Sequence, residues 1–176
     1  MIEKTGSSDF VAINVAVLTV SDTRNETTDT SGRLLSDRVK QAGHHLVEKR
    51  IVPDDPETIR STMQTWCDDT NVDVVISTGG TGITGRDSTP DVLATLFTKL
   101  IPGFGELFRM LSYEEIGSST IQSRAIGGLA GTTLLFALHG STGACRLGWD
   151  KILIHQLDVR HKPCNLVELM PRFSES

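Results

Sequence analysis

The chain has 176 residues, and its 38% hydrophobic residues together with 16 glycines are typical of one globular domain. The formal net charge of −5 excludes a protein that binds nucleic acid through a broad basic surface, because phosphate contacts need clustered Lys and Arg. No apolar run approaches the roughly 18 residues that span a bilayer, and the N-terminus lacks the features of a signal peptide, so we expect a cytoplasmic protein without a membrane segment.

Strands and helices alternate along the first part of the chain. Residues 13–22 form a β-branched run that ends in small polar residues, which predicts a buried strand. Residues 29–43 predict a helix that ends at Gly43, and residues 44–55 predict a second strand.

The same alternation continues after the second strand. Residues 54–69 predict a helix with Asp55 as its N-cap and Pro56 at its first position, and residues 71–78 predict a third strand. Residues 89–100 predict a further helix, with Thr89 as its cap and Pro90 at its start. Its buried side is expected to contain Val92, Leu93, Leu96, Phe97 and Leu100.

The last part of the chain repeats the pattern. Residues 102–117 have helical spacing, and residues 132–157 read as strand, glycine turn and helix. Alternation of this kind predicts an α/β protein with three α/β/α layers, in which a mostly parallel sheet has helices on both faces. We expect a single domain over residues 1–176 with an ordered core of about residues 11–170 and frayed ends.

Three predicted strands end in segments that are unusually rich in small polar residues. These segments are residues 19–26, which include Ser21, residues 77–87 and residues 138–144. In an open parallel sheet, ligands bind where the carboxyl ends of strands meet the following helices. We therefore expect the three segments to open on one edge of the sheet and to form the binding site there.

Four glycines, Gly79, Gly80, Gly82 and Gly85, follow the third strand. They allow positive φ angles and let phosphate oxygens approach the backbone N–H groups. The alternative is a tight strand-to-helix turn that needs glycine for its shape. Neither a dinucleotide-binding motif nor a Walker A loop fits, since residues 86–90 delay the helix and no Lys-Ser/Thr pair follows.

Aspartates lie beside this glycine loop. A carboxylate next to bound phosphate repels it unless a divalent cation lies between them, and Mg²⁺ typically bridges one or two carboxylates to phosphate oxygens. Asp87, and Asp54 or Asp22 at the other strand ends, are therefore candidate metal or positioning residues. For Asp54 the alternative is a helix cap, although Asp55 is better placed for that role. Asp91 fits a structural role in a first helical turn.

Three arginines lie next to glycine or serine turns, namely Arg33, Arg86 and Arg124. A guanidinium can hold phosphate with two parallel hydrogen bonds, so each is a candidate anion clamp. Each could equally be a solvated surface residue.

The motifs together closely resemble the MoaB/MogA family of molybdenum cofactor biosynthesis proteins. They are "STGGTGITGRDSTPD", "PGFGELFR", "SRAIGG", "HGSTGA" and the early "TVSD" and "DTSG". The resemblance covers about residues 11–165, and the tail "QLDVRHKPCN" is similar to the MoaB branch.

The resemblance implies a three-layer fold, oligomers built from trimers (a trimer or a dimer of trimers), and a pocket for molybdopterin, a pterin dithiolene with a terminal phosphate. Active members of the family use Mg²⁺ and ATP to transfer AMP to that phosphate and release pyrophosphate. Contact with other cofactor biosynthesis proteins is also expected. The alternative is a carrier or scaffold that binds molybdopterin without turnover.

The resemblance also assigns residues to roles. Asp54 and Asp87 match the family's essential carboxylates, which are the expected catalytic and metal-binding residues. The phosphate loop matches Thr78, Gly79, Gly80, Thr81 and Gly82. The expected pocket residues are Ser31, Ser118, Arg124, Gly140 and Ser141.

One position departs from the family pattern. His139 stands in the last glycine loop where many members have proline, which can change the stiffness of the loop or its nucleotide contact. Some MoaB-like members lack the two carboxylates, whereas this chain keeps both, and this favours an active enzyme.

Overall fold

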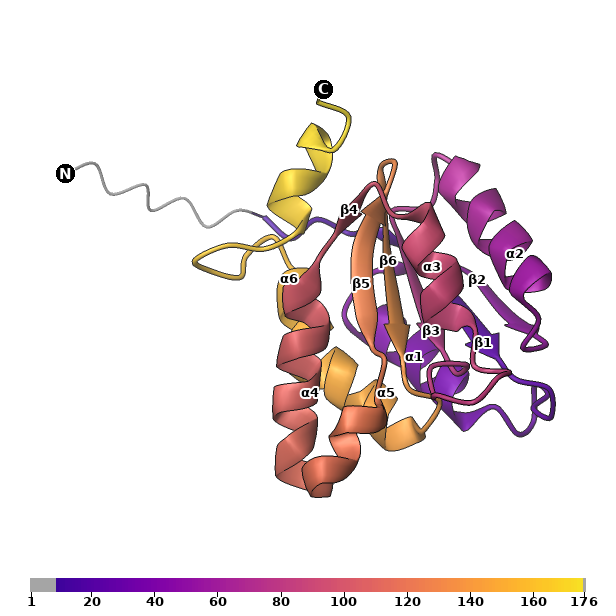
Figure 1. Cartoon of the computed structure of the whole chain (residues 1–176). Helices are drawn as coiled ribbons and strands as arrows, with labels where there is room; N and C mark the ends of the chain where they lie inside the picture. The colour runs from indigo at the N-terminus through magenta and orange to yellow at the C-terminus, as the bar shows by residue number, and fades with distance from the viewer. Residues whose placement is uncertain (1–8, 176) are drawn as a thin grey trace.

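A computed structural model of the protein describes residues 9–175, so the expected fraying of residues 1–8 lies outside the described part. Six strands form one sheet in the order β2-β1-β3-β6-β5-β4 (Figure 1). The strands are β1 (Asn14–Val20), β2 (His45–Val52), β3 (Val74–Thr78), β4 (Lys99–Leu100), β5 (Ile126–Ala130) and β6 (Thr133–Leu138). The β2-β1-β3-β6 part is parallel, and β5 and β4 add antiparallel pairs at one edge. The predicted mostly parallel sheet is confirmed.

The helices cover both faces of this sheet. They are α1 (Thr30–Gln41), α2 (Pro56–Asp68), α3 (Thr89–Leu96), α4 (Pro102–Ile116), α5 (Thr142–Gly148) and α6 (Ile154–Gln156). Two 3-10 helices, η1 (Gly117–Gln122) and η3 (Val167–Arg172), and a π-helix, η2 (Trp149–Leu153), complete the set. One buried cluster joins α1, α4 and α5 to the sheet, and a second joins α2 and α3 to the opposite face (Figure 1). This arrangement is the predicted three-layer α/β/α fold.

Successive side chains of the central strands belong alternately to the two buried clusters. Val15 and Val17 of β1 pack on the α1 side, whereas Ala16 and Leu18 pack on the α2 side. All residues of β3 and β6 are buried, because helices cover both faces of the strands. The continuous apolar runs in the sequence have this physical origin.

Helix starts agree only in part with the sequence pattern. Asp55 caps α2 as predicted, and its carboxylate accepts a hydrogen bond from the N–H of Thr58 at 2.8 Å. The predicted Thr89 cap is wrong, since α3 begins at Thr89 itself and Ser88 holds the cap position without a capping bond of its own.

The predicted burial of Leu100 on α3 is also wrong. The helix ends at Leu96, and the N–H of Thr98 instead donates to the carbonyl oxygen of Leu129 at 2.7 Å, which adds β4 to the edge of the sheet. Leu100 is consequently 53% exposed.

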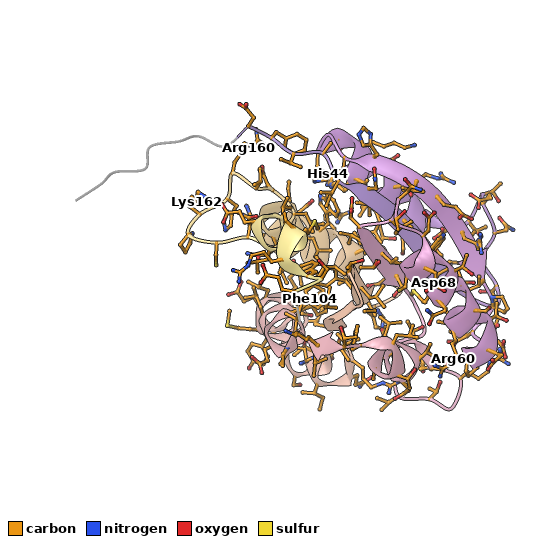
Figure 2. The ribbon with its side chains drawn as sticks, turned by 90° about the horizontal axis from the view of Figure 1, so that it is seen from above. His44, Arg60, Asp68, Phe104, Arg160 and Lys162 are labelled. Carbon is orange, nitrogen blue, oxygen red and sulfur yellow. The ribbon has the colours of Figure 1, made fainter. Side chains whose placement is uncertain are left out.

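The topology itself marks the edge where a ligand can bind. From β1 the chain moves to β2 on one side, and β3 then lies on the other side of β1. Such a reversal opens a crevice at the carboxyl ends of the neighbouring strands. That end lies at the bottom of Figure 1, and Figure 2 views the molecule from the opposite end, where His44 and Arg160 are labelled. Between residues 9 and 175, no helix has the length and apolar character needed to cross a membrane.

Candidate functional site

The loops after β1, β3 and β6 meet at the carboxyl edge of the sheet and enclose a cleft of about 400 Å³. The cleft is lined by Val20, Ser21, Thr23, Arg24, Gly79, His139, Gly140 and Ser141. Four candidates from the sequence, Ser21, Gly79, Gly140 and Ser141, therefore line one hollow.

The turn after β3 brings these loops into direct contact. Gly79 and Gly80 have φ angles of +96° and +64°, which side chains disfavour. A β-carbon on Gly79 would lie 2.2 Å from the carbonyl oxygen of Val20, and one on Gly140 would lie 3.3 Å from the Cα of Gly79. The shape of the turn alone therefore requires glycine at position 79.

The same turn leaves backbone donors free. The N–H of Gly79 donates to the carbonyl oxygen of Leu138, but the N–H groups of Gly80, Thr81 and Gly140 meet no acceptor among residues 9–175. The hydroxyls of Thr81 and Thr89 are buried and also lack a partner in that part of the chain. Buried polar groups are normally paired, so this concentration of unpaired donors fits a site that binds an anion.

Asp54 reaches this turn from the loop after β2. Its Oδ1 accepts a hydrogen bond from the hydroxyl of Ser88 at 3.1 Å, and its Oδ2 would lie 2.9 Å from a β-carbon on Gly80. Burial raises the pKa of Asp54, hydrogen bonds from Ser88 oppose this rise, and the negative charges of Asp87 and Asp22 add to it, so that the pKa is raised on balance. A nearby cation would therefore stabilise the ionised carboxylate.

Asp87 flanks the other side of the loop. Its Oδ2 accepts hydrogen bonds from the backbone N–H and the hydroxyl of Thr84 at 2.9 and 2.5 Å, and it would lie 2.7 Å from a β-carbon on Gly82. The Thr84 hydroxyl is the main cause that lowers the pKa of Asp87, and backbone N–H groups and the charge of Arg124 also lower it. Asp87 is thus held as an ionised carboxylate beside the glycine loop.

The two carboxylates fit a magnesium ion that is shared with a phosphate ligand. Within residues 9–175, no three His, Cys, Asp or Glu side chains gather as a preformed metal site. Mg²⁺ commonly uses one or two carboxylates and takes its other ligands from phosphate and water. Asp54 and Asp87 satisfy this pattern at the turn with the free amides.

Asp22 links the loop after β1 to the loops after β2 and β3. Its Oδ1 accepts a hydrogen bond from the N–H of Asp54 at 3.1 Å, and its Oδ2 lies 2.7 Å from the guanidinium of Arg86. Arg86 also donates to the carbonyl oxygen of Asp54. Arg86 is 68% exposed, so a phosphate ligand can compete for it.

Arg124 holds the backbone of the glycine loop after β3. Its three guanidinium nitrogens donate to the carbonyl oxygen of Gly82, to the carbonyl oxygen of Asp87 and to both oxygens of the Asp91 carboxylate. Arg33 likewise donates to the carbonyls of residues 26 and 27. Both arginines thus hold backbone carbonyls of neighbouring loops, and their role as phosphate clamps stays a prediction.

Ser31 and Thr78 do not line the cleft but hold the loop after β6 that does. The buried Ser31 hydroxyl donates to the carbonyl oxygen of Gly140 at 2.8 Å, and the buried Thr78 hydroxyl donates to that of His139 at 3.2 Å. Ser118 lies apart from them. It is exposed in η1 and shares no hydrogen bond with these residues in the part of the chain that the structure describes.

Sequence reasoning missed Arg24, whereas it had singled out His139 for an effect on the stiffness of the last glycine loop. Arg24 donates to the Ser31 hydroxyl and to the carbonyl oxygen of Gly140, both at 2.9 Å. The Nδ1 of His139 accepts a hydrogen bond from the N–H of Ser141 at 3.3 Å, which links the two residues of this loop. A basic residue in the first strand-end segment was the only signal for Arg24.

Comparison with known proteins identifies the family of the chain. Residues 16–159 match the family described as "Probable molybdopterin binding domain". The chain is 50% identical over 159 residues to Molybdenum cofactor biosynthesis protein B of Escherichia coli K12, which covers 90% of this chain and 94% of the relative. The protein of the same name from Bacillus cereus is 47% identical over 146 residues, which covers 82% and 86% of the two chains.

Solved structures show the same likeness. A crystal structure of Molybdenum cofactor biosynthesis protein B superposes with a TM-score of 0.84 at 41% identity, covering 94% of this chain and 98% of the other. The tungsten cofactor synthesizing protein MoaB from Pyrococcus furiosus superposes with a TM-score of 0.76 at 33% identity, covering 93% and 98%. The chain therefore belongs to the MoaB/MogA family of molybdenum cofactor biosynthesis proteins and to its MoaB-like branch.

Proposed function

We propose that this protein acts in molybdenum cofactor biosynthesis by transferring AMP from ATP to the terminal phosphate of molybdopterin, with release of pyrophosphate. The observation that carries this proposal is the placement of Asp54 and Asp87 on either side of a turn whose amides at Gly80 and Thr81 have no partner among residues 9–175. Free amides suit phosphate oxygens, and the carboxylates suit a cation between the phosphates.

The reaction needs positioning more than acid–base chemistry. An oxygen of the molybdopterin phosphate forms a bond to the α-phosphorus of ATP, the bond from that phosphorus to the bridging oxygen breaks, and pyrophosphate leaves with the electron pair. The attacking phosphate is already ionised at neutral pH, so no strong general base is required. Bringing two polyanions together is the main difficulty, and it is solved by fixed donors and charge neutralisation.

Each residue of the site has a part in this scheme. The amides of Gly80, Thr81 and Gly140 hold phosphate oxygens, and Asp54 and Asp87 would hold Mg²⁺. When bound, the ion neutralises the charge that develops on the phosphates during transfer. Thr84 fixes the orientation of Asp87 through two hydrogen bonds.

A molybdopterin carrier or scaffold is the second candidate function. It is favoured by the hydrogen bonds that Asp87 already makes to Thr84 and by the lack of a preformed metal cage within residues 9–175. In that case the turn would bind the pterin phosphate without ATP turnover. Asp87→Asn separates the two functions, because it removes a metal ligand and leaves the amides in place.

The deciding assay incubates the purified protein anaerobically with molybdopterin, ATP and Mg²⁺ and measures adenylylated molybdopterin and pyrophosphate. The enzyme proposal expects both products from the wild type and at least a 100-fold loss with Asp87→Asn, while molybdopterin affinity changes less than about threefold. Tight molybdopterin binding by the wild type without either product would instead establish the carrier.

We also propose that the protein forms a homo-oligomer, a trimer or a dimer of trimers, through the outer face of α4 and η1. Large apolar side chains are 38–79% exposed there: Leu107, Met110, Tyr113, Ile116 and Ile121. Contiguous apolar surface of this kind usually marks an interface. Ser118 lies on the same segment, so such an interface would place it near a neighbouring protomer and account for its isolation within one chain.

A further inference from the structure

Arg24 connects three parts of the chain at the cleft. It follows β1, and its guanidinium donates to the Ser31 hydroxyl at the start of α1 and to the Gly140 carbonyl after β6, both at 2.9 Å. Ser31 donates to the same carbonyl oxygen at 2.8 Å. The Arg24 side chain is 30% exposed and lines the 400 Å³ cleft together with Gly79 and Ser141.

The charge of Arg24 is only partly neutralised by the protein. Its hydrogen bonds all reach neutral oxygens, and the nearest carboxylate, Asp29, lies 3.8 Å away. Asp29 is fully buried and pairs more closely with Lys49 at 2.9 Å. Glu26 lies on the outer side of Lys49 and is 73% exposed, so water screens it. The guanidinium therefore keeps positive charge for the cleft.

The other half of the site has the opposite charge. Asp54 lies beside Gly80, Asp87 lies beside Gly82, and Asp22 accepts a hydrogen bond from the N–H of Asp54, so this side carries several carboxylates. A phosphate without a bound cation is repelled on this side, whereas a phosphate that shares a magnesium ion is accepted. Arg24 thus makes its side of the cleft suitable for a phosphate that has no metal.

We propose that Arg24 is a substrate-binding residue that holds the terminal phosphate of the pterin substrate in this cleft, while the Asp54 and Asp87 side receives the metal-bound phosphates of ATP. This assignment rests on the proposed AMP transfer. The two phosphates then meet at residues 79 and 80, where the Arg24 cleft borders the acidic turn. Arg24 also donates to the Gly140 carbonyl and so holds the loop after β6 beside the cleft.

The test compares two ligands that differ only in the phosphate: molybdopterin and its phosphatase-treated form, both kept anaerobic and without ATP. Dissociation constants are measured by calorimetry for wild type, Arg24→Gln, Arg24→Lys and the control Arg160→Gln. Arg160 stacks on Phe10 at the opposite end of the sheet (Figure 2), so its loss leaves the cleft intact. Thermal melts verify that each variant is folded.

The wild type and the Arg160 variant are expected to bind the phosphorylated ligand about 10-fold to 100-fold more tightly than the dephosphorylated one. Arg24→Gln should reduce this preference below about threefold and leave the affinity for the dephosphorylated ligand unchanged. Arg24→Lys should keep part of the preference for the phosphorylated ligand, since lysine retains the positive charge but cannot make both hydrogen bonds to Ser31 and Gly140.

Two results would overturn the assignment. One is an unchanged phosphate preference in Arg24→Gln, and the other is an equal loss of affinity for both ligands, which would limit Arg24 to shaping the loop. The AMP transfer assay on the same wild-type sample judges the proposed function separately. A wild type with phosphate preference but no AMP transfer would reject the enzyme and retain the Arg24 site.

Discussion

The Oδ1 of Asp54 accepts a hydrogen bond of 3.1 Å from the hydroxyl of Ser88, the residue that directly precedes α3. This bond joins the loop after β2 to the loop after β3. It also holds a carboxylate at a partly buried position between two other aspartates, where its pKa is raised. The ionised carboxylate of Asp54 is therefore unfavourable for the folded protein, and a nearby cation would offset this.

Asp54→Asn should make the metal-free protein more stable at neutral pH while it abolishes AMP transfer. A raised folded-state pKa means that the folded protein binds the Asp54 proton more tightly than the unfolded chain. The contribution of Asp54 to stability therefore falls as pH rises from the ordinary carboxyl pKa through the raised value. Thermal melts in EDTA should show a higher Tm for the variant at pH 7 and a difference that shrinks toward acid pH. An equal or lower Tm at pH 7 would refute this account.

Asp29 should have the opposite effect on stability. It is fully buried, caps α1 through the N–H of Gly32 and pairs with Lys49 at 2.9 Å. Asp29→Ala leaves Lys49 without its buried partner and should cost about 3–5 kcal/mol in urea unfolding. Asp29→Asn retains an oxygen for the cap and should cost less. A loss below about 1 kcal/mol for the alanine variant would contradict the role of the pair.

The pH dependence of Asp29 follows from its lowered pKa. Burial alone would raise this pKa, but hydrogen bonds from Gly32, Lys49 and Thr19 together outweigh the effect of burial. Its contribution to stability is thus complete above the ordinary carboxyl pKa and is lost as pH falls through the lowered folded value. Over this acid range, the free energy of unfolding should change more steeply with pH in the wild type than in Asp29→Asn.

Arg124 should matter for turnover more than for affinity. Its guanidinium holds the carbonyl oxygens of Gly82 and Asp87, which fixes the loop that presents the Asp87 carboxylate. Arg124→Lys loses this fork, so we expect kcat to fall about 10-fold to 100-fold with less than a threefold change in molybdopterin affinity. Asp91→Asn is the matched control, because it weakens the exposed ion pair and keeps both carbonyl contacts. Equal effects of the two variants would assign the role to the ion pair instead.

A charge on the exposed face of α4 should disrupt the oligomer. Met110 is 61% exposed among other apolar side chains, so Met110→Glu would bury a carboxylate in the proposed interface. Light scattering should find the wild type as a trimer or hexamer and the variant as smaller species. The control Asp68→Asn changes an exposed carboxylate at the end of α2, which packs on the opposite face of the sheet, and should leave the assembly intact. A monomeric wild type would refute the interface.

The alternation of strands and helices was sufficient to predict the three layers, but not the antiparallel edge of the sheet. In β5, Gly127 and Gly128 weaken the strand pattern of the sequence, and the structure shows why glycine is needed at both positions. A β-carbon on Gly128 would lie 2.5 Å from the ring of Phe97, and one on Gly127 would lie 2.7 Å from that of Phe136. These glycines make room for aromatic rings, and this packing cannot be read from local sequence. Leu100 continued an amphipathic pattern after the helix had already ended.

The glycine loop and the two carboxylates were visible in the sequence because they are local motifs. The partners of the arginines were not. Arg24 bonds to Gly140 across 116 positions, and Arg124 bonds to Gly82 across 42. Only the order of strands in the sheet brings such residues together, so sequence proximity to a turn was a poor guide to the partners of each arginine.

The central claim is that the acidic turn accepts phosphate only together with a cation. The most direct measurement is ATP binding by calorimetry, in Mg²⁺ and in EDTA, for the wild type and the double variant Asp54→Asn, Asp87→Asn. We predict that EDTA weakens ATP binding to the wild type at least tenfold and that the double variant binds metal-free ATP more tightly than the wild type does. Wild-type affinity that is the same in Mg²⁺ and EDTA, together with no gain in the double variant, would contradict the claim.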